Sequence, residues 1–395
     1  MALLTRRRIL LAKIESTYNT DSSPLAANAM LIRNLDMTPL DAEIVSRDLV
    51  RPYFGNYDQI IAAQKVVLTF EVELQGSGTA GVAPSYGPLM RACGMSETVT
   101  AAAVTGSAQA GTTTTITLAA GSSSVTNFYV GLPVTITSGT GIGSSGTIGG
   151  YNGTTKVATV VTPFATAPAA ASAYSIGPGV VYKPVSSSFE SVTIYAQPQD
   201  SVQSSSPLHK VTGCRGNVEF MTNSKGLPTA KFTMTGVYNT VVDAANLTAT
   251  YTGFQTPIAV NKANTPRFNF FGLSAIMSEF GVNMNNEVVY RNLVNSESVI
   301  LTDRKAGGTA VFEAPTISTG TYAQDFFATA LGTTNGSLQL THGSTTGFVI
   351  DMTSYTTVDV QNPTYTDMDG IVMMSLPFVL VPTTLGNDEF YICAR

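Results

Sequence analysis

The stretch from Lys65 to Gly94 constrains the fold more than any other part of the sequence. It begins with a strict alternation of apolar and polar residues, which is typical of a β-strand with one buried and one exposed face. The apolar set is Val66, Leu68, Phe70, Val72 and Leu74, and the opposite set includes Glu71 and Glu73. A loop rich in glycine and proline follows, and then a short helical pattern at 86–93 that Gly94 ends. The stretch therefore predicts a strand, a long loop and a short helix, with two carboxylates on the exposed strand face.

The same order of patterns occurs a second time in the C-terminal half of the chain. Arg47-Asp48-Leu49-Val50 recurs as Arg291-Asn292-Leu293-Val294, and the strand at 67–74 recurs at 308–315, which aligns Phe70-Glu71 with Phe312-Glu313. The helix at 86–94 recurs at 322–332, the strand at 191–196 recurs at 337–342, and a hairpin at 217–238 recurs at 362–380. Five elements in one order at similar spacing predict two copies of one β-rich unit, each with a short flanking helix.

The composition changes abruptly after residue 98. The segment 99–179 holds a single charged residue, Lys156, and consists of short β-branched runs separated by turn signals. We expect a small β-domain at 99–179, inserted into a first unit formed by 1–98 and 180–240. A linker at 241–270 and a second unit at 271–395 complete the predicted division of a mainly β, sandwich- or barrel-like chain.

Charge and cysteine usage exclude several classes of protein. Charged residues make up 12% of the chain, about half the usual share of roughly 25%, and the net charge is −5. A general nucleic-acid binder would need a basic surface. The three cysteines are far apart and predict neither a disulfide framework nor a zinc site, so we expect reduced, buried thiols in a protein made in the cytoplasm. No apolar run is long enough to span a membrane, and Lys13 and Glu15 interrupt the only signal-like segment too early.

No catalytic, cofactor or metal site is predicted. The two histidines, His209 and His342, lack a nucleophile elbow nearby, so we expect structural or surface roles. Gly141 to Gly146 matches a dinucleotide-binding pattern, but β-type sequence follows where a helix is required, which favours a glycine-rich turn. Asp367 to Gly370 resembles the start of a calcium loop without the remaining ligands, which favours a hairpin turn. We therefore expect a protein that is not an enzyme.

Whole segments resemble the major tail (tail tube) proteins of tailed bacteriophages. The first is LTFEVELQGSG…PSYGPLMRACG, and the others are GVNMNNEVVYRNLVNSESVILTDRKAGGTAVFEAP and the ending MDGIVMMSLPFVLVPTTLGNDEFYI. The resemblance covers most of the chain except 99–179. The long, two-copy form and the insert favour, by analogy, the type with a long, non-contractile tail. The insert is similar to the small β-modules that such virion proteins carry on their outer surface.

The resemblance implies a structural virion protein that polymerises into stacked rings around a channel for the genome. A ring contains six tube units, so a chain with two units implies a trimer with approximate six-fold symmetry. The expected partners are further copies of the chain, the tape measure, tail terminator and tail tip proteins at the tube ends, and double-stranded DNA passing through without specific binding. The N-terminal segment, which could be a short helix or an arm, and the loop at 76–84 are candidates for reaching the next ring. A hexameric tube protein of a contractile system is the alternative within this class.

Four carboxylates are candidates for the channel wall. Glu71 and Glu73 share one strand face, Glu219 lies on a strand that can neighbour it, and Glu313 is the duplicate of Glu71. An acidic or neutral wall would leave the DNA polyanion hydrated and moving, whereas a basic wall would bind it. The competing interpretation is that these residues are ordinary solvent-facing positions of half-buried strands.

A surface-binding protein is the alternative from another class. The insert and its Thr- and Ser-rich strands could form a glycan-binding or adhesive module. Such modules stack sugars on exposed aromatic rings. The insert has no Trp, and its aromatic residues are Phe128, Tyr129, Tyr151, Phe164 and Tyr174.

Overall fold

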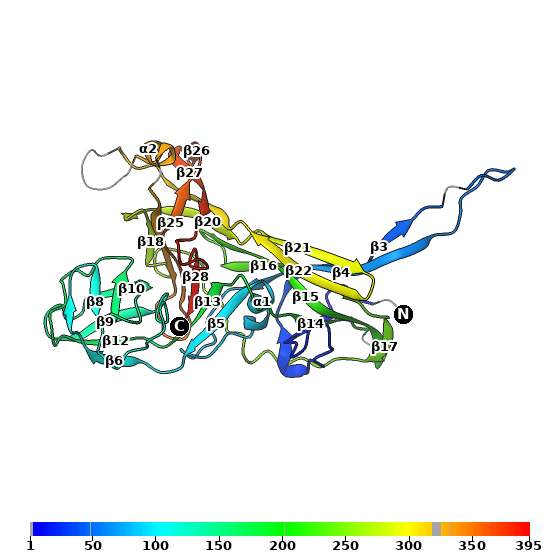
Figure 1. The fold of residues 1–395 in the computed structure, drawn as a ribbon, viewed down its shortest axis with the longest axis horizontal. Helices are drawn as coiled ribbons and strands as arrows, with labels where there is room; N and C mark the ends of the chain where they lie inside the picture. The colour runs from blue at the N-terminus through cyan, green and yellow to red at the C-terminus, as the bar shows by residue number, and fades with distance from the viewer. Residues whose placement is uncertain (1–2, 48, 201, 318–324, 333) are drawn as a thin grey trace.

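The computed structural model describes residues 3–47, 49–200, 202–317, 325–332 and 334–395. The body is elongated, with a small β-domain at one end and a long hairpin arm projecting from the other (Figure 1). Strands dominate the described residues, which hold only two α-helices, α1 and α2, each six residues long. The predicted mainly β fold is confirmed, and the strands of the described part of the chain pack face to face without closing into a barrel.

The first unit consists of antiparallel strands arranged in two layers. Its strands follow the order β2, β1, β14, β15, β16, β4, β3, and α1 packs against the layer of β1 and β14. The bounds are β1 (Arg8–Ile14), β2 (Ala29–Met30), β3 (Arg33–Val45), β4 (Ile60–Glu73), α1 (Gly87–Ala92), β14 (Val192–Pro198), β15 (Ser205–Asn223) and β16 (Thr229–Tyr238), with a 3-10 turn at Ala26–Asn28.

The second unit repeats this pairing order. Its strands run β19, β18, β24, β25, β27, β23, β20, and β26 pairs with the first half of β27, so β25 and β26 together occupy the place of β15. The bounds are β18 (Arg267–Phe270), β19 (Leu273–Ser274), β20 (Met277–Asn283), β21 (Asn286–Leu293), β22 (Ser296–Arg304), β23 (Gly307–Glu313), α2 (Phe326–Leu331), β24 (Gly336–His342), β25 (Ile350–Val360), β26 (Thr364–Met368) and β27 (Ile371–Leu380). Both predicted helices are present, although residues 322–324 of the second prediction lie outside the described residues.

Two joints connect the units. The end of β15, Glu219 to Asn223, pairs antiparallel with β20 of the second unit. On the other layer, β28 (Tyr391–Ala394) lies between β25 and β13 (Gly179–Pro184), and β13 in turn pairs with β5 (Met95–Thr100). The predicted linker carries a strand at each end, because β17 (Val242–Ala245) pairs with β15 and β18 pairs with β24.

The alternating apolar residues of β4 point into the core of the first unit. Val66, Leu68, Phe70, Val72 and Leu74 are all at most 3% exposed, whereas the residues between them are half-buried. Phe70 stacks on Phe232 of β16 with ring centroids 5.8 Å apart. The equivalent Phe312 lies in a cluster of rings with Phe268, Phe270 and Phe326, so each unit closes its two layers over buried aromatic side chains.

The chain between β5 and β13 forms a separate seven-stranded sheet. Its order is β6, β12, β9, β10, β11, β8, β7, with bounds β6 (Val104–Ser107), β7 (Ala110–Gly111), β8 (Thr115–Thr117), β9 (Pro133–Ser138), β10 (Ser145–Tyr151), β11 (Val157–Val160) and β12 (Ala173–Ile176). Its apolar core extends onto Val181 and Tyr391 of the host strands. The buried Gln339 of β24 donates to Thr147 Oγ1 at 2.6 Å and accepts from Thr162 Oγ1 at 2.7 Å, which holds this small domain against the second unit.

The expectation of an N-terminal helix or free arm is wrong. Residues Arg8–Ile14 form β1, which lies between β2 and β14, and Leu10 and Leu11 are buried. Glu15 follows as a buried carboxylate that accepts hydrogen bonds from Ser191 Oγ at 2.6 Å and from the Gly213 amide at 2.8 Å. This segment is therefore a central part of the first unit rather than a tether to another ring.

The register of β5 and β13 makes the insert removable. Because Thr100 lies directly opposite Gly179, a two-residue Asn-Gly turn can replace residues 101–178 and join the strands as a hairpin. We expect this variant, with Val181→Thr to reduce the newly exposed apolar surface, to give a strand-rich circular dichroism spectrum and one cooperative unfolding transition. An unfolded or aggregated product would show that the host units depend on the insert for their stability.

Candidate functional site

The outward face of the sheet carries a row of charged residues across three strands. Glu71 of β4 lies opposite Lys231 of β16, and Lys231 lies opposite Glu219 of β15. The structure thus brings two of the four predicted wall residues into one row, with Glu73 two positions further along β4. Lys231 was not among the predicted site residues, although the alternation of β16 places it on the same face.

The Glu71 carboxylate is held by two neighbours on β3. Arg33 Nε donates to its Oε2 at 2.7 Å, and Asn34 Nδ2 donates to its Oε1 at 3.2 Å. Partial burial opposes ionisation, but these hydrogen bonds and the positive charges of Arg33 and Lys231 outweigh it and lower the pKa of Glu71. Glu71 is therefore an ionised, positioned carboxylate rather than a free one.

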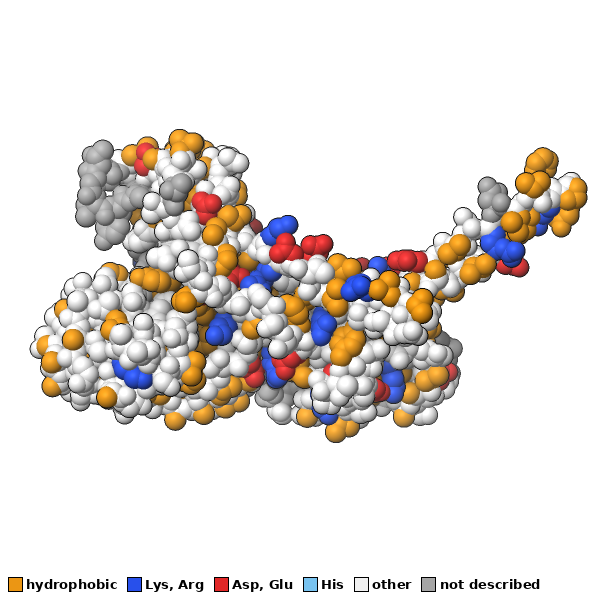
Figure 2. Space-filling model, in the orientation of Figure 1, with side chains coloured by type: hydrophobic (Ala, Val, Ile, Leu, Met, Phe, Trp, Pro, Cys, Tyr) orange, Lys and Arg blue, Asp and Glu red, His pale blue; other side chains and the backbone are white. Residues whose placement is uncertain are grey.

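The same face continues into the second unit through the joint of β15 and β20. Glu219 lies opposite Asn283, and Glu279, further along β20, is exposed on this face because its neighbour Phe280 points into the core. Glu313 takes the position of Glu71 in the second unit, opposite Met373 where the first unit has Lys231. Figure 2 shows acidic and basic side chains gathered along the concave edge between the upper end of the second unit and the hairpin arm. The face is of mixed charge, with carboxylates in both units.

Sequence reasoning missed Glu279. Its signal was available, because the alternation of Glu279, Phe280, Gly281 and Val282 resembles that of β4. The segment that carries the resemblance begins at Gly281, so Glu279 lies just outside it and is not assigned to a strand face in the sequence analysis.

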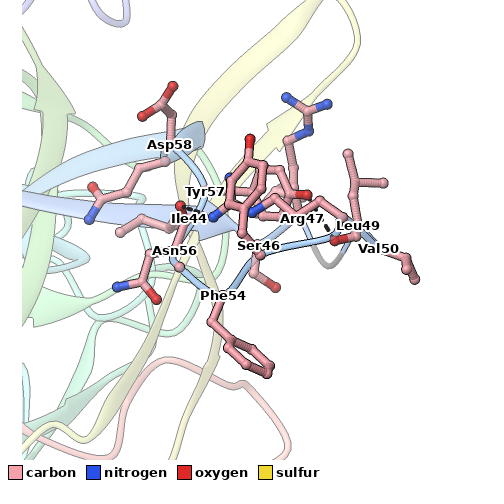
Figure 3. Close-up of a pocket in the computed structure, with 14 residues that line it drawn as sticks. Ile44, Ser46, Arg47, Leu49, Val50, Phe54, Asn56, Tyr57 and Asp58 are labelled. Atoms are coloured by element: carbon pink, nitrogen blue, oxygen red, sulfur yellow. Dashed lines mark hydrogen bonds between the residues drawn. The ribbon is translucent and has the colours of Figure 1, made fainter.

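The arm formed by β3 and β4 ends in an unusual tip. Arg51 stacks over the rings of Tyr57 and Tyr53, at 4.2 and 4.7 Å from their centroids, and Tyr57 Oη donates to the Leu49 carbonyl at 2.8 Å. Val50 and Phe54 are fully exposed and point away from this cluster (Figure 3). The tip is thus internally ordered, while its apolar side chains have no partner among the described residues.

The second unit carries the equivalent hairpin, β21 and β22, in a different environment. It folds back across β15 and β16 of the first unit (Figure 1). Val299 of β22 donates its amide to Tyr18 Oη at 2.6 Å and accepts from Arg215 Nη1 at 2.8 Å, while Tyr290 Oη donates to the Gln64 carbonyl at 2.8 Å. One hairpin is therefore packed on its own molecule, and the other extends into solvent.

The remaining chemical groups have structural roles. His342 is buried, its pKa is lowered by burial, and its two ring nitrogens lie 2.9 Å from Thr265 Oγ1 and 3.1 Å from the Ile258 carbonyl. All three cysteines are buried thiols. Gly141 and Gly143 lie in the turn between β9 and β10, and Gly146 is already part of β10. Asp369 and Gly370, both with positive φ, form the turn between β26 and β27, as the sequence predicts.

The described residues contain neither a metal-binding cluster nor a membrane-spanning helix. In the ranges given above, no group of three or more His, Cys, Asp and Glu side chains is placed to hold a metal ion. None of the helices in this part of the chain has the length and apolar character needed to cross a bilayer.

The aromatic residues of the insert are used in its own core. Tyr129, Tyr151, Phe164 and Tyr174 are buried, and Phe128 packs partly buried against them. These five rings therefore present no stacking platform of the kind on which the glycan-binding alternative depends.

Comparison with known proteins adds no relative. No protein-family model matches the sequence, and a search of curated proteins found no match.

The lowered pKa of Glu71 predicts a pH-dependent contribution to stability. Because the folded-state pKa is below the ordinary value of 4.5, the stabilisation is present above that pH and is lost as the pH falls through the folded-state pKa. We expect Glu71→Gln to lower the free energy of unfolding by about 0.5–1 kcal/mol at pH 7, since the pair with Arg33 is partly exposed. Urea denaturation at pH 7 and at pH 3 measures the difference, which should shrink at the lower pH.

Glu73→Gln is the matched control for this prediction, because it removes one carboxylate from the same strand face without touching the contacts of Arg33. Equal losses for the two variants at both pH values would contradict the assigned role of Glu71.

Proposed function

We propose that this chain is a structural virion protein of the tail tube type, three copies of which form a ring with approximate six-fold symmetry. The observation that carries the proposal is the repeated strand order of the two units and their edge-to-edge joint at β15 and β20. A chain that already joins two copies of one unit through sheet edges can be extended by the same contact to further copies. The resemblance of the repeated segments to tail tube proteins supports the same assignment.

The open edges favour ring formation. Among the strands of the described residues, β3 at one end of the two-unit sheet pairs only with β4, and β26 at the other end pairs only with β27. The two edges differ, so association between copies is head-to-tail, and such contacts give rings when the rotation closes. Ring closure would also remove exposed strand edges, which otherwise promote uncontrolled aggregation.

The charged face suits a channel for DNA. In the proposed ring, the face that carries Glu71, Glu219, Glu279 and Glu313 lines the lumen. DNA carries about one negative charge per 1.7 Å of its axis, so carboxylates that recur around the channel keep it from binding the wall. Arg33 is paired with Glu71, and Lys231 lies opposite both Glu71 and Glu219, so each of these two cations has a carboxylate neighbour that competes with phosphate.

The proposed location and partners follow from this role. The protein is made in the host cytoplasm and resides in the virion tail. Stacked rings contact each other, the tube ends contact the tape measure, tail terminator and tail tip proteins, and double-stranded DNA passes through during ejection. The insert, which lies at the end of the body away from the hairpin arm in Figure 1, faces outward.

Electron microscopy of the purified chain tests the proposal. We expect stacked rings with a central channel, and averaged end views with three copies of the chain and pseudo-six-fold density. Native mass spectrometry of the smallest ring supplies the stoichiometry independently. Discrete particles without a channel would overturn the tube assignment, and rings of six chains would support the hexameric alternative instead.

Charge reversal on the proposed lumen face tests the channel wall. We expect assembled Glu73→Lys/Glu219→Lys tubes to retain double-stranded DNA that wild-type tubes release, with retention falling steeply as salt rises because phosphate contacts release counterions. Co-sedimentation of linear DNA with tubes measures the effect. Asp243→Lys on β17, an exposed position outside this face, is the single-charge control. If Asp243→Lys tubes retained as much DNA per added positive charge as the double variant, the assignment of the lumen face would be contradicted.

A further inference from the structure

The two units share their strand order but differ in what covers them. The first unit is covered by the second along β15. Within the described residues no strand pairs with the corresponding outer edge of the second unit, although Phe327 of α2 packs on Tyr365 of β26 with ring centroids 5.6 Å apart. The difference can be followed residue by residue, because the pairing registers of the two units define equivalent positions.

The register of β4 and β23 gives the equivalences. Phe70 lies opposite Phe232, and the duplicate Phe312 lies opposite Met374, so Phe232 and Met374 are equivalent. Phe232 in turn lies opposite Val218, and Met374 lies opposite Tyr365. The edge strand β26 therefore stands where the first unit has the end of β15, with Met368 in place of Met221.

Equivalent positions are buried in the first unit and exposed in the second. Val218 is 0% exposed but Tyr365 is 58% exposed, and Ala230 is 0% exposed but Val372 is 56% exposed. On the outward face, Val237 is 6% exposed whereas its counterpart Val379 is 39% exposed. Ile371 and Met368 add further exposed apolar surface around the same edge. A bare strand edge rimmed by apolar side chains is a site for strand addition.

The strand that can cover this edge, β3, lies at the opposite end of the molecule. In the second unit Phe280 of β20 lies opposite Ala310, and in the first unit Met37 of β3 lies opposite Leu68, so β3 stands where the second unit has β20. β20 pairs with a strand on both sides, whereas among the described residues β3 pairs with a strand on one side only. Near the start of β3, the Leu35 carbonyl accepts a hydrogen bond from Arg8 Nη1 at 3.0 Å. The arm beyond β3 is the counterpart of the hairpin of β21 and β22, which packs across β15 and β16.

We propose that β3 of one copy pairs antiparallel with β26 of a second copy, and that the arm of the first lies across β26 and β27 of the second. The template is the joint inside the chain, where Met221 lies opposite Gly281 and Glu219 lies opposite Asn283. Transferred to the free edges, this register places Met368 opposite Thr38. β3 carries one extra residue between Thr38 and Asp41, so beyond that bulge the template places Thr366 opposite Asp41. The inference deepens the proposed function and rests on it for ring closure.

The arm is suited to this contact. It carries exposed apolar residues along both strands, including Leu40, Ile44, Val45, Ile60 and Ile61, which a free arm would leave in water. The bare surface of β26 and β27 is apolar as well. In contrast, the packed hairpin of β21 and β22 buries Val299 completely against the first unit. A second copy of this chain is the occupant that matches both the strand register and the apolar surface.

A disulfide between designed cysteines tests the register. Directly opposed residues of antiparallel strands have Cα atoms about 4.5–5.5 Å apart, which a disulfide can span. Thr38 and Met368 are both exposed, and the three native cysteines are buried. We expect the double variant Thr38→Cys/Met368→Cys, oxidised after assembly, to give covalent dimers and trimers on denaturing gels, with the closed trimer as the final product.

The matched control moves one cysteine along the same strand. Thr364 is four residues from Met368, about 13 Å away, so Thr38→Cys/Thr364→Cys should remain mainly monomeric under the same oxidation. A second pair, Asp41→Cys/Thr366→Cys, tests the same joint on the other side of the β3 bulge and replaces the first pair if that variant fails to fold.

The outcomes separate the inference from the proposed function. Tubes seen by microscopy without cross-links from either in-register pair would overturn the β3–β26 joint and leave the tube assignment standing. In-register cross-links in a preparation that never forms tubes would support the joint and overturn the tube assignment. If the control pair Thr38→Cys/Thr364→Cys cross-linked equally well, the register would be overturned, because the two strands would then have to pair in more than one register.

Discussion

Antiparallel main-chain pairing at sheet edges is the interaction on which this molecule depends. The five residue pairs between β15 and β20 convert two β-sandwich units into one continuous sheet. They satisfy backbone donors and acceptors that would otherwise face water at two open edges, and they align the polar faces of both units on one side. The continuation of the charged face into the second unit and the position of the β21–β22 hairpin follow from this joint.

The sequence predicted the repeated unit well because its signals are local. Alternation in β4, the helix after it and the turn at Asp369-Gly370 each depend on residues close in the chain. The duplication made these signals stronger, since two weak patterns in the same order are harder to obtain by chance. The burial of Leu68, Phe70 and Val72 confirms the predicted inner face.

The features that could not be predicted depend on contacts between distant segments. Arg33 and Asn34 reach Glu71 only because β3 pairs with β4 across a long hairpin, and nothing near Glu71 in the chain indicates them. The N-terminal segment has too short an apolar run to distinguish a strand from a helix, and its place between β2 and β14 decided the outcome. The aromatic residues of the insert likewise gave no indication of whether they face its core or solvent.

The presence of two units in one chain affects how assembly depends on protein concentration. The β15–β20 joint forms within one chain, so its effective concentration is set by the connecting segment and does not change on dilution. The equivalent joint between chains is bimolecular and weakens as the protein is diluted. A chain of this design would therefore need half as many encounters between molecules to close a ring as a chain with a single unit. The critical concentration for closure of a single ring would then report on only one kind of sheet joint, the one between β3 and β26.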